Sequence, residues 1–276
     1  MPFNTALYRT RRLALCCALA WLTQGAFAQS VVRVSGTGSG TGGMRLLAQA
    51  FMQANPAVRV EVLPALGSSG GISALMAGQI ELAVSNRPPK PAEIDKLAML
   101  SVEYARTPFV VAVHKDLGVS ALTSTQLAAL FAEGAATFPN GKRARPVLRM
   151  SDAGDTALFK SFGPAVAAAI DGATQRRGML NADTDSEAAD LVEGTSGAFA
   201  GSTLALIESE KRPLIGLTID GKAPTVAAFL DGSYPYFKPL YMIIGVQAGA
   251  ETTRFAAYLQ STPGRAMLRA HGHAPL

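Results

Sequence analysis

Two short runs of glycine, serine and threonine carry the residues best suited to chemistry. The first is GTGSGTGG at 36–43, and the second is GSSGG at 67–71. Each run follows a strand-like segment and precedes a helical pattern. Glycines let the backbone approach a ligand, and the free N–H groups and dipole of a helix N-terminus attract an anion. The chemistry that both runs favour is therefore the binding of a small oxyanion.

The first run also satisfies a dinucleotide-binding fingerprint. Gly38, Gly40 and Gly43 match G-x-G-x-x-G between a strand and a helix, and Glu61 follows about 20 residues later, as that motif asks. Glycine-rich runs meet this pattern by chance, however, so the match is weak.

The second run matches the nucleophile elbow G-x-S-x-G, which makes a secreted serine hydrolase the enzymatic alternative. Ser69 would be the nucleophile, and His271 or His273 would be the base in the expected chain order. Against this alternative, the elbow would follow only the second strand, and both histidines lie in a short C-terminal tail. We therefore expect a binding protein and not an enzyme.

Both runs also have a purely structural interpretation. Glycines form tight turns, and serine caps helices by accepting a backbone N–H hydrogen bond. This interpretation suffices for either run alone. It explains less well why hydroxyl residues gather at the carboxyl ends of neighbouring strands, as do Thr37, Ser39, Thr41, Ser68 and Ser69.

Strand-like and helical patterns alternate along the first part of the chain. VVRVS (31–35), VRVEVLP (58–64) and IELAVS (80–85) are strand-like, whereas MRLLAQAFMQA (44–54) and ISALMAG (72–78) have helical apolar spacing. This alternation predicts an α/β fold with a mostly parallel sheet flanked by helices. In such sheets ligands bind beyond the carboxyl ends of the strands, where both glycine runs lie.

Two extended segments divide the chain into two lobes. TPFVVAVHK (107–115) is predicted to cross into a second lobe, and YPYFKPLYMIIGV (234–246) to return from it. We therefore assign residues 29–108 and 234–276 to lobe 1 and residues 109–233 to lobe 2. Two lobes joined by two crossings can hinge around a cleft.

The remaining predicted elements follow the same reasoning. Helices are expected at 123–131, from about 155, and at 185–194, 252–260 and 263–271, and a strand at 145–150. The second lobe is expected to continue through 196–202 and 214–219. The acids within 181–193 are interpreted as the solvated start and face of a helix, because Asp and Glu favour the first turn.

Residues 1–28 predict a cleaved secretory signal peptide. Three arginines precede an apolar run at 13–22, and small residues at 26–28 suit cleavage. The run is far shorter than the ~20 residues that span a bilayer. We therefore expect a periplasmic protein that begins near Gln29. Such a protein would rarely meet a nicotinamide cofactor, so we expect no cofactor.

Cleavage of this segment changes the cysteine content and the net charge of the protein. Both cysteines, Cys16 and Cys17, lie within it, so we expect neither a disulfide nor thiol chemistry in the mature protein. The net charge falls from +5 to +2, because three arginines and no acids are lost. No cluster of Lys and Arg with interleaved aromatics occurs, so nothing indicates nucleic-acid binding.

Taken in order, these motifs resemble the PstS-like family, the periplasmic phosphate-binding components of ABC transporters. The first glycine run, LGSSGGISALMAGQIELAVSNRPP (66–89), VHKDLGVSALTSTQLAALF (113–131) and VLRMSDAGDTALF (147–159) are similar to segments of that family. The resemblance covers essentially the whole mature chain. It implies a two-lobed periplasmic-binding-protein fold of type II, a monomer, phosphate as the ligand, and a membrane ABC permease as partner.

The resemblance also implies a binding site that draws on both lobes. The residues carried over are Ser39, Gly40, Thr41, Ser68, Ser69, Asn86, Arg87, Arg149, Ala153, Gly154 and Asp155. Two helix N-termini, hydroxyl donors and arginines can hold a dianion without a counter-ion or metal. Arg149 would be the main charge partner, since a guanidinium suits bidentate recognition of an oxyanion.

This sequence departs from the family pattern at positions that the resemblance places in contact with the ligand. Asn86 stands where some members carry a carboxylate, and Ala153-Gly154-Asp155 replaces Ser-Gly-Thr. Asp155 is either an N-cap or a cleft residue that accepts a hydrogen bond from a proton-bearing oxygen. In the second case we hypothesise that Asp155 selects protonated phosphate over sulfate. A binding protein or sensor for a different small anion is the alternative.

Overall fold

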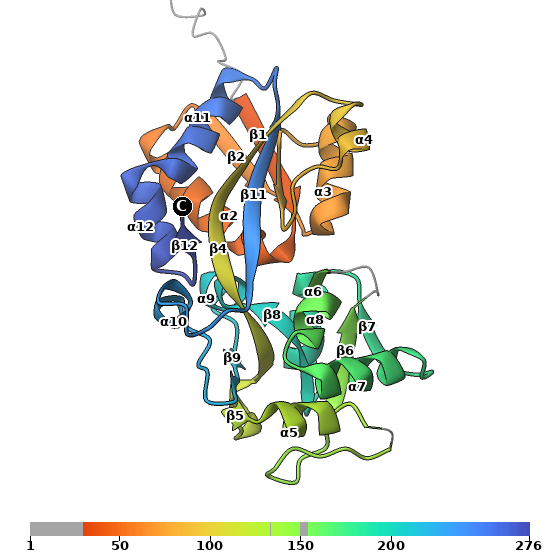
Figure 1. Cartoon of the computed structure of the whole chain (residues 1–276). Helices are drawn as coiled ribbons and strands as arrows, with labels where there is room; N and C mark the ends of the chain where they lie inside the picture. Colours follow the sequence, from red (N-terminus) through yellow and green to blue (C-terminus); the bar gives the residue numbers. More distant parts are fainter. Residues whose placement is uncertain (1–29, 133, 150–153) are drawn as a thin grey trace, which may run out of the picture.

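The computed structural model describes residues 30–132, 134–149 and 154–276. The predicted signal peptide and Ala153 lie outside the described residues. The rest forms two α/β lobes stacked one above the other (Figure 1), which confirms the predicted fold class. No helix in these three ranges is long and apolar enough to cross a membrane.

Lobe 1 is built on three parallel strands in the order β2-β1-β3, with β11 added antiparallel to β3. These strands are β1 (Ser30–Gly36), β2 (Val58–Val62), β3 (Leu82–Ser85) and β11 (Phe237–Gly245). The helices and the short last strand are α2 (Gly38–Ala54), α3 (Gly67–Met76), α4 (Pro91–Ile94), α11 (Ala250–Gln260), α12 (Thr262–Arg269) and β12 (Ala274–Pro275). Alternate residues of β1, Val32 and Val34, pack with Leu47 and Phe51 of α2 in the core.

Lobe 2 continues the same sheet through β4, β8, β6 and β7. Its strands are the end of β4, β5 (Ala121–Leu122), β6 (Arg145–Arg149), β7 (Leu180–Ala182), β8 (Ala198–Thr203), β9 (Leu214–Gly216) and β10 (Thr218–Ile219). Its helices are η1 (Lys115–Leu117), α5 (Ser124–Ala129), α6 (Gly154–Lys160), α7 (Pro164–Thr174), α8 (Asp185–Gly194), α9 (Leu204–Ser209) and α10 (Val226–Leu230). Phe109, Phe131, Phe159 and Phe199 form edge-on pairs in its core.

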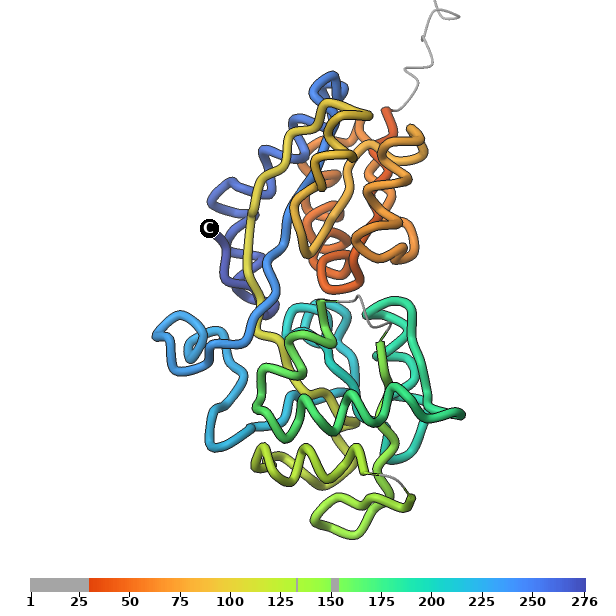
Figure 2. The backbone as a smooth tube through the Cα atoms, turned by 45° about the vertical axis from the view of Figure 1, so that its right-hand side comes forward, coloured from red at the N-terminus to blue at the C-terminus, as the bar shows by residue number. Residues whose placement is uncertain are grey.

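Strand β4 (Met99–His114) belongs to both lobes. Its first part pairs with β11 and its second part pairs with β8, in both cases antiparallel. Figure 2 shows β4 and β11 running side by side out of lobe 1 before they part. The predicted crossings at 107–115 and 234–246 therefore fall on these two strands, although β4 begins earlier than predicted. The predicted division at residues 108/109 and 233/234 stays a proposal.

The glycine runs form the first turns of two helices, whereas the sequence pattern placed the runs before the helices. Helix α2 begins at Gly38 and α3 at Gly67. Gly36 has φ +143°, and a Cβ there would lie 1.9 Å from the Val84 carbonyl oxygen. A Cβ at Gly38 would lie 2.8 Å from the main-chain nitrogen of Ser186. Glycine at 38 therefore allows the start of α2 to contact the start of α8 in the other lobe.

Candidate functional site

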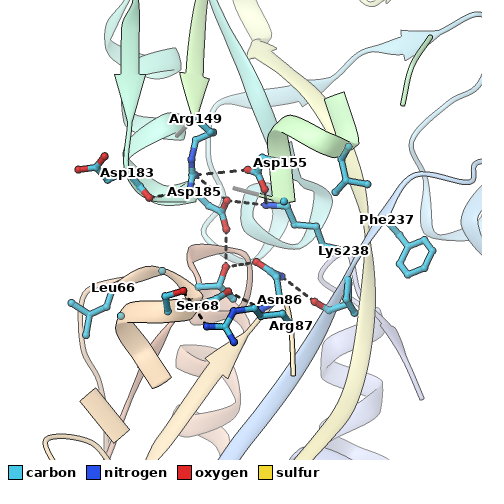
Figure 3. Close-up of a pocket in the computed structure, with 17 residues that line it drawn as sticks. Leu66, Ser68, Asn86, Arg87, Arg149, Asp155, Asp183, Asp185, Phe237 and Lys238 are labelled. Carbon is cyan, nitrogen blue, oxygen red and sulfur yellow. Dashed lines mark hydrogen bonds and ion pairs between the residues drawn. The ribbon is translucent and has the colours of Figure 1, made fainter. Parts of the chain in front are cut away.

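A cavity of about 610 Å³ opens between the lobes. Lobe 1 contributes the N-terminus of α3 and the segment after β3, and lobe 2 contributes the ends of β6 and β7 and the starts of α6 and α8 (Figure 3). Four of the charged residues that line it lie together, namely Arg149, Asp155, Asp185 and Lys238. We call these four residues the buried charge cluster. The other lining residues are Thr37, Leu66, Gly67, Ser68, Ser69, Gly70, Asn86, Arg87, Gly154, Leu158, Asp183, Phe237 and Pro239.

The carboxylate of Asp185 lies at the N-terminus of α2. Its Oδ2 accepts hydrogen bonds from the main-chain N–H of Ser39 at 3.1 Å, from the Ser39 hydroxyl at 2.6 Å and from the Thr37 hydroxyl at 2.8 Å. Asp185 is itself the first residue of α8, whose N-cap Thr184 accepts the N–H of Glu187. The N-termini of two helices, one from each lobe, thus meet at one carboxylate, and both favour a negative charge there.

The other carboxylate oxygen of Asp185 is held by two cations. Arg149 donates to Oδ1 at 3.1 Å from the end of β6, and Lys238 donates to it at 2.9 Å from β11. Lys238 also forms a short ion pair with Asp155, and Arg149 lies 3.8 Å from the second oxygen of Asp155. The cluster therefore pairs two cations with two carboxylates at the junction of both lobes and the crossing strand.

Burial makes these charges strongly dependent on one another, since Asp155 and Asp185 are each 4% exposed and Lys238 is 3% exposed. Burial alone would raise the pKa of Asp185, but Lys238 and Arg149 outweigh it and hold that pKa well below its ordinary value. For Asp155, burial prevails and, with repulsion from Asp185, raises the pKa to about 6 against the attraction of Lys238. The two carboxylates are thus unequal, and Asp155 is the one that can take up a proton.

Polar residues of lobe 1 line the opposite wall. The hydroxyl of Ser68 accepts the main-chain N–H of Asn86, whose side chain joins Thr37 to the Pro239 carbonyl. Arg87 makes two 2.8 Å contacts with Glu93 and reaches the Ser69 hydroxyl at 3.1 Å. Its guanidinium lowers the pKa of Glu93 to about 2. Arg87 is therefore already neutralised by a partner in its own lobe.

The structure brings most of the predicted site residues together at the cavity. Seven of the predicted residues line it, namely Ser68, Ser69, Asn86, Arg87, Arg149, Gly154 and Asp155. Ser39 lies behind Asp185 and contacts its carboxylate. Gly40 and Thr41 face the interior of lobe 1, because a Cβ at Gly40 would meet Val84 and the Thr41 hydroxyl contacts the Gly38 carbonyl.

Asp185 and Lys238 are site residues that sequence reasoning missed. The interpretation of the acids at 181–193 as a solvated helix face is wrong for Asp185, which is buried against α2. Lys238 lies in the segment YPYFKPLY, which was interpreted only as a crossing. A single lysine within an apolar strand is the signal that could have pointed to it, because such a charge needs buried partners.

The geometry around Ser69 does not form a nucleophile elbow. Ser69 is in the first turn of α3, and its hydroxyl contacts Arg87. His271 and His273 contact main-chain carbonyls of Met267 and His271 at the end of α12. Among residues 30–132, 134–149 and 154–276, no group of three His, Cys, Asp or Glu side chains could hold a metal ion.

Comparisons with known proteins agree with this fold. The model of the PBP superfamily domain matches residues 23–263. Protein SphX of Synechococcus elongatus is 26% identical over 257 residues, which cover 83% of this chain and 73% of that protein.

Solved structures show the same architecture. A putative phosphate ABC transporter substrate-binding protein from Clostridium perfringens, with bound phosphate, is similar with a TM-score of 0.70 and 20% identity, over 90% of this chain and all of that one. The periplasmic molybdate-binding protein of Azotobacter vinelandii is similar with a TM-score of 0.62 and 15% identity, over 88% of this chain and 98% of that one.

Proposed function

The chain belongs to the PBP superfamily, and on that premise we propose that it is an extracytoplasmic solute-binding protein that captures phosphate or a related oxyanion between its lobes. The observation that carries this proposal is the polar lining that both lobes give to the cavity. The N-terminus of α3 with Ser68, and the side chain of Asn86, face it from lobe 1, and the guanidinium of Arg149 faces it from lobe 2. A helix N-terminus, a hydroxyl, an amide and a guanidinium are groups that bind an oxyanion.

The relatives support the same ligand class. The Clostridium protein holds phosphate and the Azotobacter protein is named for molybdate, and both ligands are oxyanions. By analogy with the ABC transporter protein, we propose that this chain delivers its ligand to a membrane permease. The proposed signal peptide at residues 1–28 would place it in the periplasm.

Capture would work by closure of the lobes. Ser68 and Asn86 approach the cavity from lobe 1, and Arg149 approaches it from lobe 2. A ligand that contacts both walls binds the closed arrangement better than an open one, and this difference in affinity shifts the population towards closure. Within the described residues, the chain passes from one lobe to the other at β4 and returns at β11. These two strands are therefore where the lobes would hinge.

Titration calorimetry tests this proposal. The exported protein is freed of bound ligand by unfolding and refolding, and phosphate and sulfate are titrated into it separately. We expect one phosphate to bind per chain. Failure of phosphate and every other oxyanion to bind the refolded protein, with its circular dichroism restored, would contradict the proposal.

A small organic anion is a second candidate, favoured by the size and walls of the cavity. A volume of about 610 Å³ lies within the range of sites for drug-sized ligands. Leu66, Leu158 and Phe237 supply an apolar lining beside the polar groups. Titration with a phosphate monoester beside inorganic phosphate distinguishes the two, since only the ester would gain affinity from this wall.

We further propose that the protein is not an enzyme. The one pattern that suggested catalysis, at Ser69, has an arginine and not a histidine as its hydroxyl contact. Ser69→Ala should retain ligand binding, and the purified protein should turn over no ester. Ester hydrolysis that disappears in Ser69→Ala would restore the hydrolase alternative.

A further inference from the structure

Asp185 occupies a place that an external anion would otherwise take. The donors at the start of α2, namely the N–H and hydroxyl of Ser39, are directed to its carboxylate. A bound oxyanion cannot use these donors while Asp185 holds them. The anion-binding end of α2 is therefore filled by the protein's own side chain.

The cations of the cleft are also balanced internally. Arg149 and Lys238 face Asp155 and Asp185, so the buried charge cluster has no net charge when both acids are ionised. Arg87 is paired with Glu93, and Asp183 adds a further acid to the lining. A fully ionised dianion entering this cavity would add two charges to a site with no surplus cation to receive them.

Two polar atoms of the buried charge cluster lack a hydrogen-bond partner. Among the described residues, the buried Nε of Arg149 and the buried Oδ2 of Asp155 have no hydrogen-bond partner. One is a donor and the other an acceptor, and both belong to residues that line the cavity. An anion could reach both atoms only if these side chains rearranged on binding. It would then need an ionised oxygen for Nε and a hydroxyl for Oδ2, and a dianion without a proton supplies only the first.

We propose that Asp185 is a built-in anion that determines ligand charge, so that the cleft accepts singly charged, proton-bearing oxyanions and rejects dianions. This inference rests on the proposed function and adds the residue that limits it. At the N-terminus of α2, the carboxylate of Asp185 supplies the negative charge that a ligand would otherwise supply. It also neutralises one of the two positive charges of Arg149 and Lys238. Removing its charge while keeping its shape should convert the cleft into a dianion site.

The test compares wild type, Asp185→Asn and Asp183→Asn by titration with sulfate and with phosphate. Sulfate is the decisive probe, because it carries two charges and no proton at neutral pH. We expect the affinity for sulfate to rise at least tenfold in Asp185→Asn. Asp183→Asn removes the same charge from an exposed lining residue that makes no side-chain contact with α2 in the described structure, and should change affinity less than threefold.

Several outcomes separate this inference from the proposed function. Phosphate binding by wild type without a gain for sulfate in Asp185→Asn would overturn the inference alone, as would equal gains in both variants. No oxyanion binding by any of the three proteins would overturn the proposed function as well. Phosphate binding by wild type, together with sulfate binding that appears only in Asp185→Asn, would support the inference.

A second measurement covers the case in which Asp185→Asn fails to fold. Phosphate is titrated into wild type at pH 8 in two buffers of different ionisation enthalpy, which gives the number of protons taken up on binding. We expect uptake of about one proton per phosphate in wild type and also in Asp155→Asn, because the dianion that prevails in solution must itself gain a proton to enter. Uptake that is lost in Asp155→Asn would assign the proton to Asp155 and overturn the inference. Binding without proton uptake would overturn the inference.

Discussion

Asp185 in lobe 2 accepts hydrogen bonds from both the main-chain N–H and the hydroxyl of Ser39 in lobe 1, at 3.1 Å and 2.6 Å. One buried carboxylate thereby ties the start of α8 to the start of α2. Because Arg149 and Lys238 hold its other oxygen, this link also connects the lobes to the crossing strand β11. The stability of this arrangement and its affinity for anions should therefore respond to the same few residues.

Ser39→Ala should destabilise the protein although it adds no bulk. The variant loses a buried hydrogen bond to a charged acceptor, which is worth about 1.5–3 kcal/mol, while the main-chain N–H bond stays. Urea unfolding followed by circular dichroism measures the loss. Ser69→Ala is the control, since its hydroxyl lies nearer to solvent, and it should cost less than about 1 kcal/mol. Equal losses in the two variants would contradict this account.

Lys238→Met should be among the most destabilising single changes in the cleft. It leaves Asp155 and Asp185 buried together with only Arg149 between them, and an uncompensated buried charge costs about 3–5 kcal/mol. Removing the surplus acid as well, in Lys238→Met/Asp155→Leu, should recover most of the unfolding free energy. Additive losses in the double variant, measured by urea unfolding, would show that the two residues do not interact.

Asp155 should make stability depend on pH between about 4 and 6. Burial raises its pKa to about 6 in the folded protein, whereas an unfolded aspartate titrates near 3.9. The folded state thus holds more protons in this window, so the stabilisation present below pH 4 is lost as pH rises through 6. Relative to Asp155→Asn, wild type should lose about 2–3 kcal/mol of unfolding free energy from pH 4 to pH 7. A constant difference, or a gain, would contradict the assignment.

Gly38→Ala should weaken ligand binding by hindering the approach of the lobes. The added Cβ would lie 2.8 Å from the Ser186 nitrogen, a contact that only a shift between α2 and α8 can relieve. We expect at least a tenfold loss of phosphate affinity and a larger radius of gyration by small-angle scattering. Gly172→Ala is the control, because nothing lies within 4 Å of its added Cβ. Unchanged affinity in Gly38→Ala would show that closure does not need this contact.

Local sequence patterns predicted most of the fold because they reflect local physics. The apolar spacing of α2, α3 and α11 and the alternation in β1 and β2 identify elements that each bury one face. The beginning of β4 was not predicted, since MLSVEYARTP carries charges and a proline within the strand. Those charges, Glu103 and Arg106, pair with each other at 2.6 Å on the strand surface.

The polar residues of the site were only partly predictable. Recognisable sequence motifs lie next to Arg149, Ser68 and Asn86. No motif marks Asp185 or Lys238, which become site residues because the fold brings them into contact. Their burial depends on partners 53 residues apart in sequence, and no local pattern reports such a pairing. A helix-starting aspartate is equally suited to solvent, and only the position of α2 shows that this one is buried.

Phosphate titration of wild type, Arg149→Ala and Arg145→Ala tests the central claim most directly. Arg149 lines the cavity from the end of β6, whereas Arg145 begins the same strand and contacts the Ser196 carbonyl. The account predicts at least a roughly 100-fold loss of phosphate affinity in Arg149→Ala, from the loss of two or more charged hydrogen bonds, and less than a threefold change in Arg145→Ala. Folded Arg149→Ala that binds phosphate as tightly as wild type would contradict the claim that the ligand lies in this cleft.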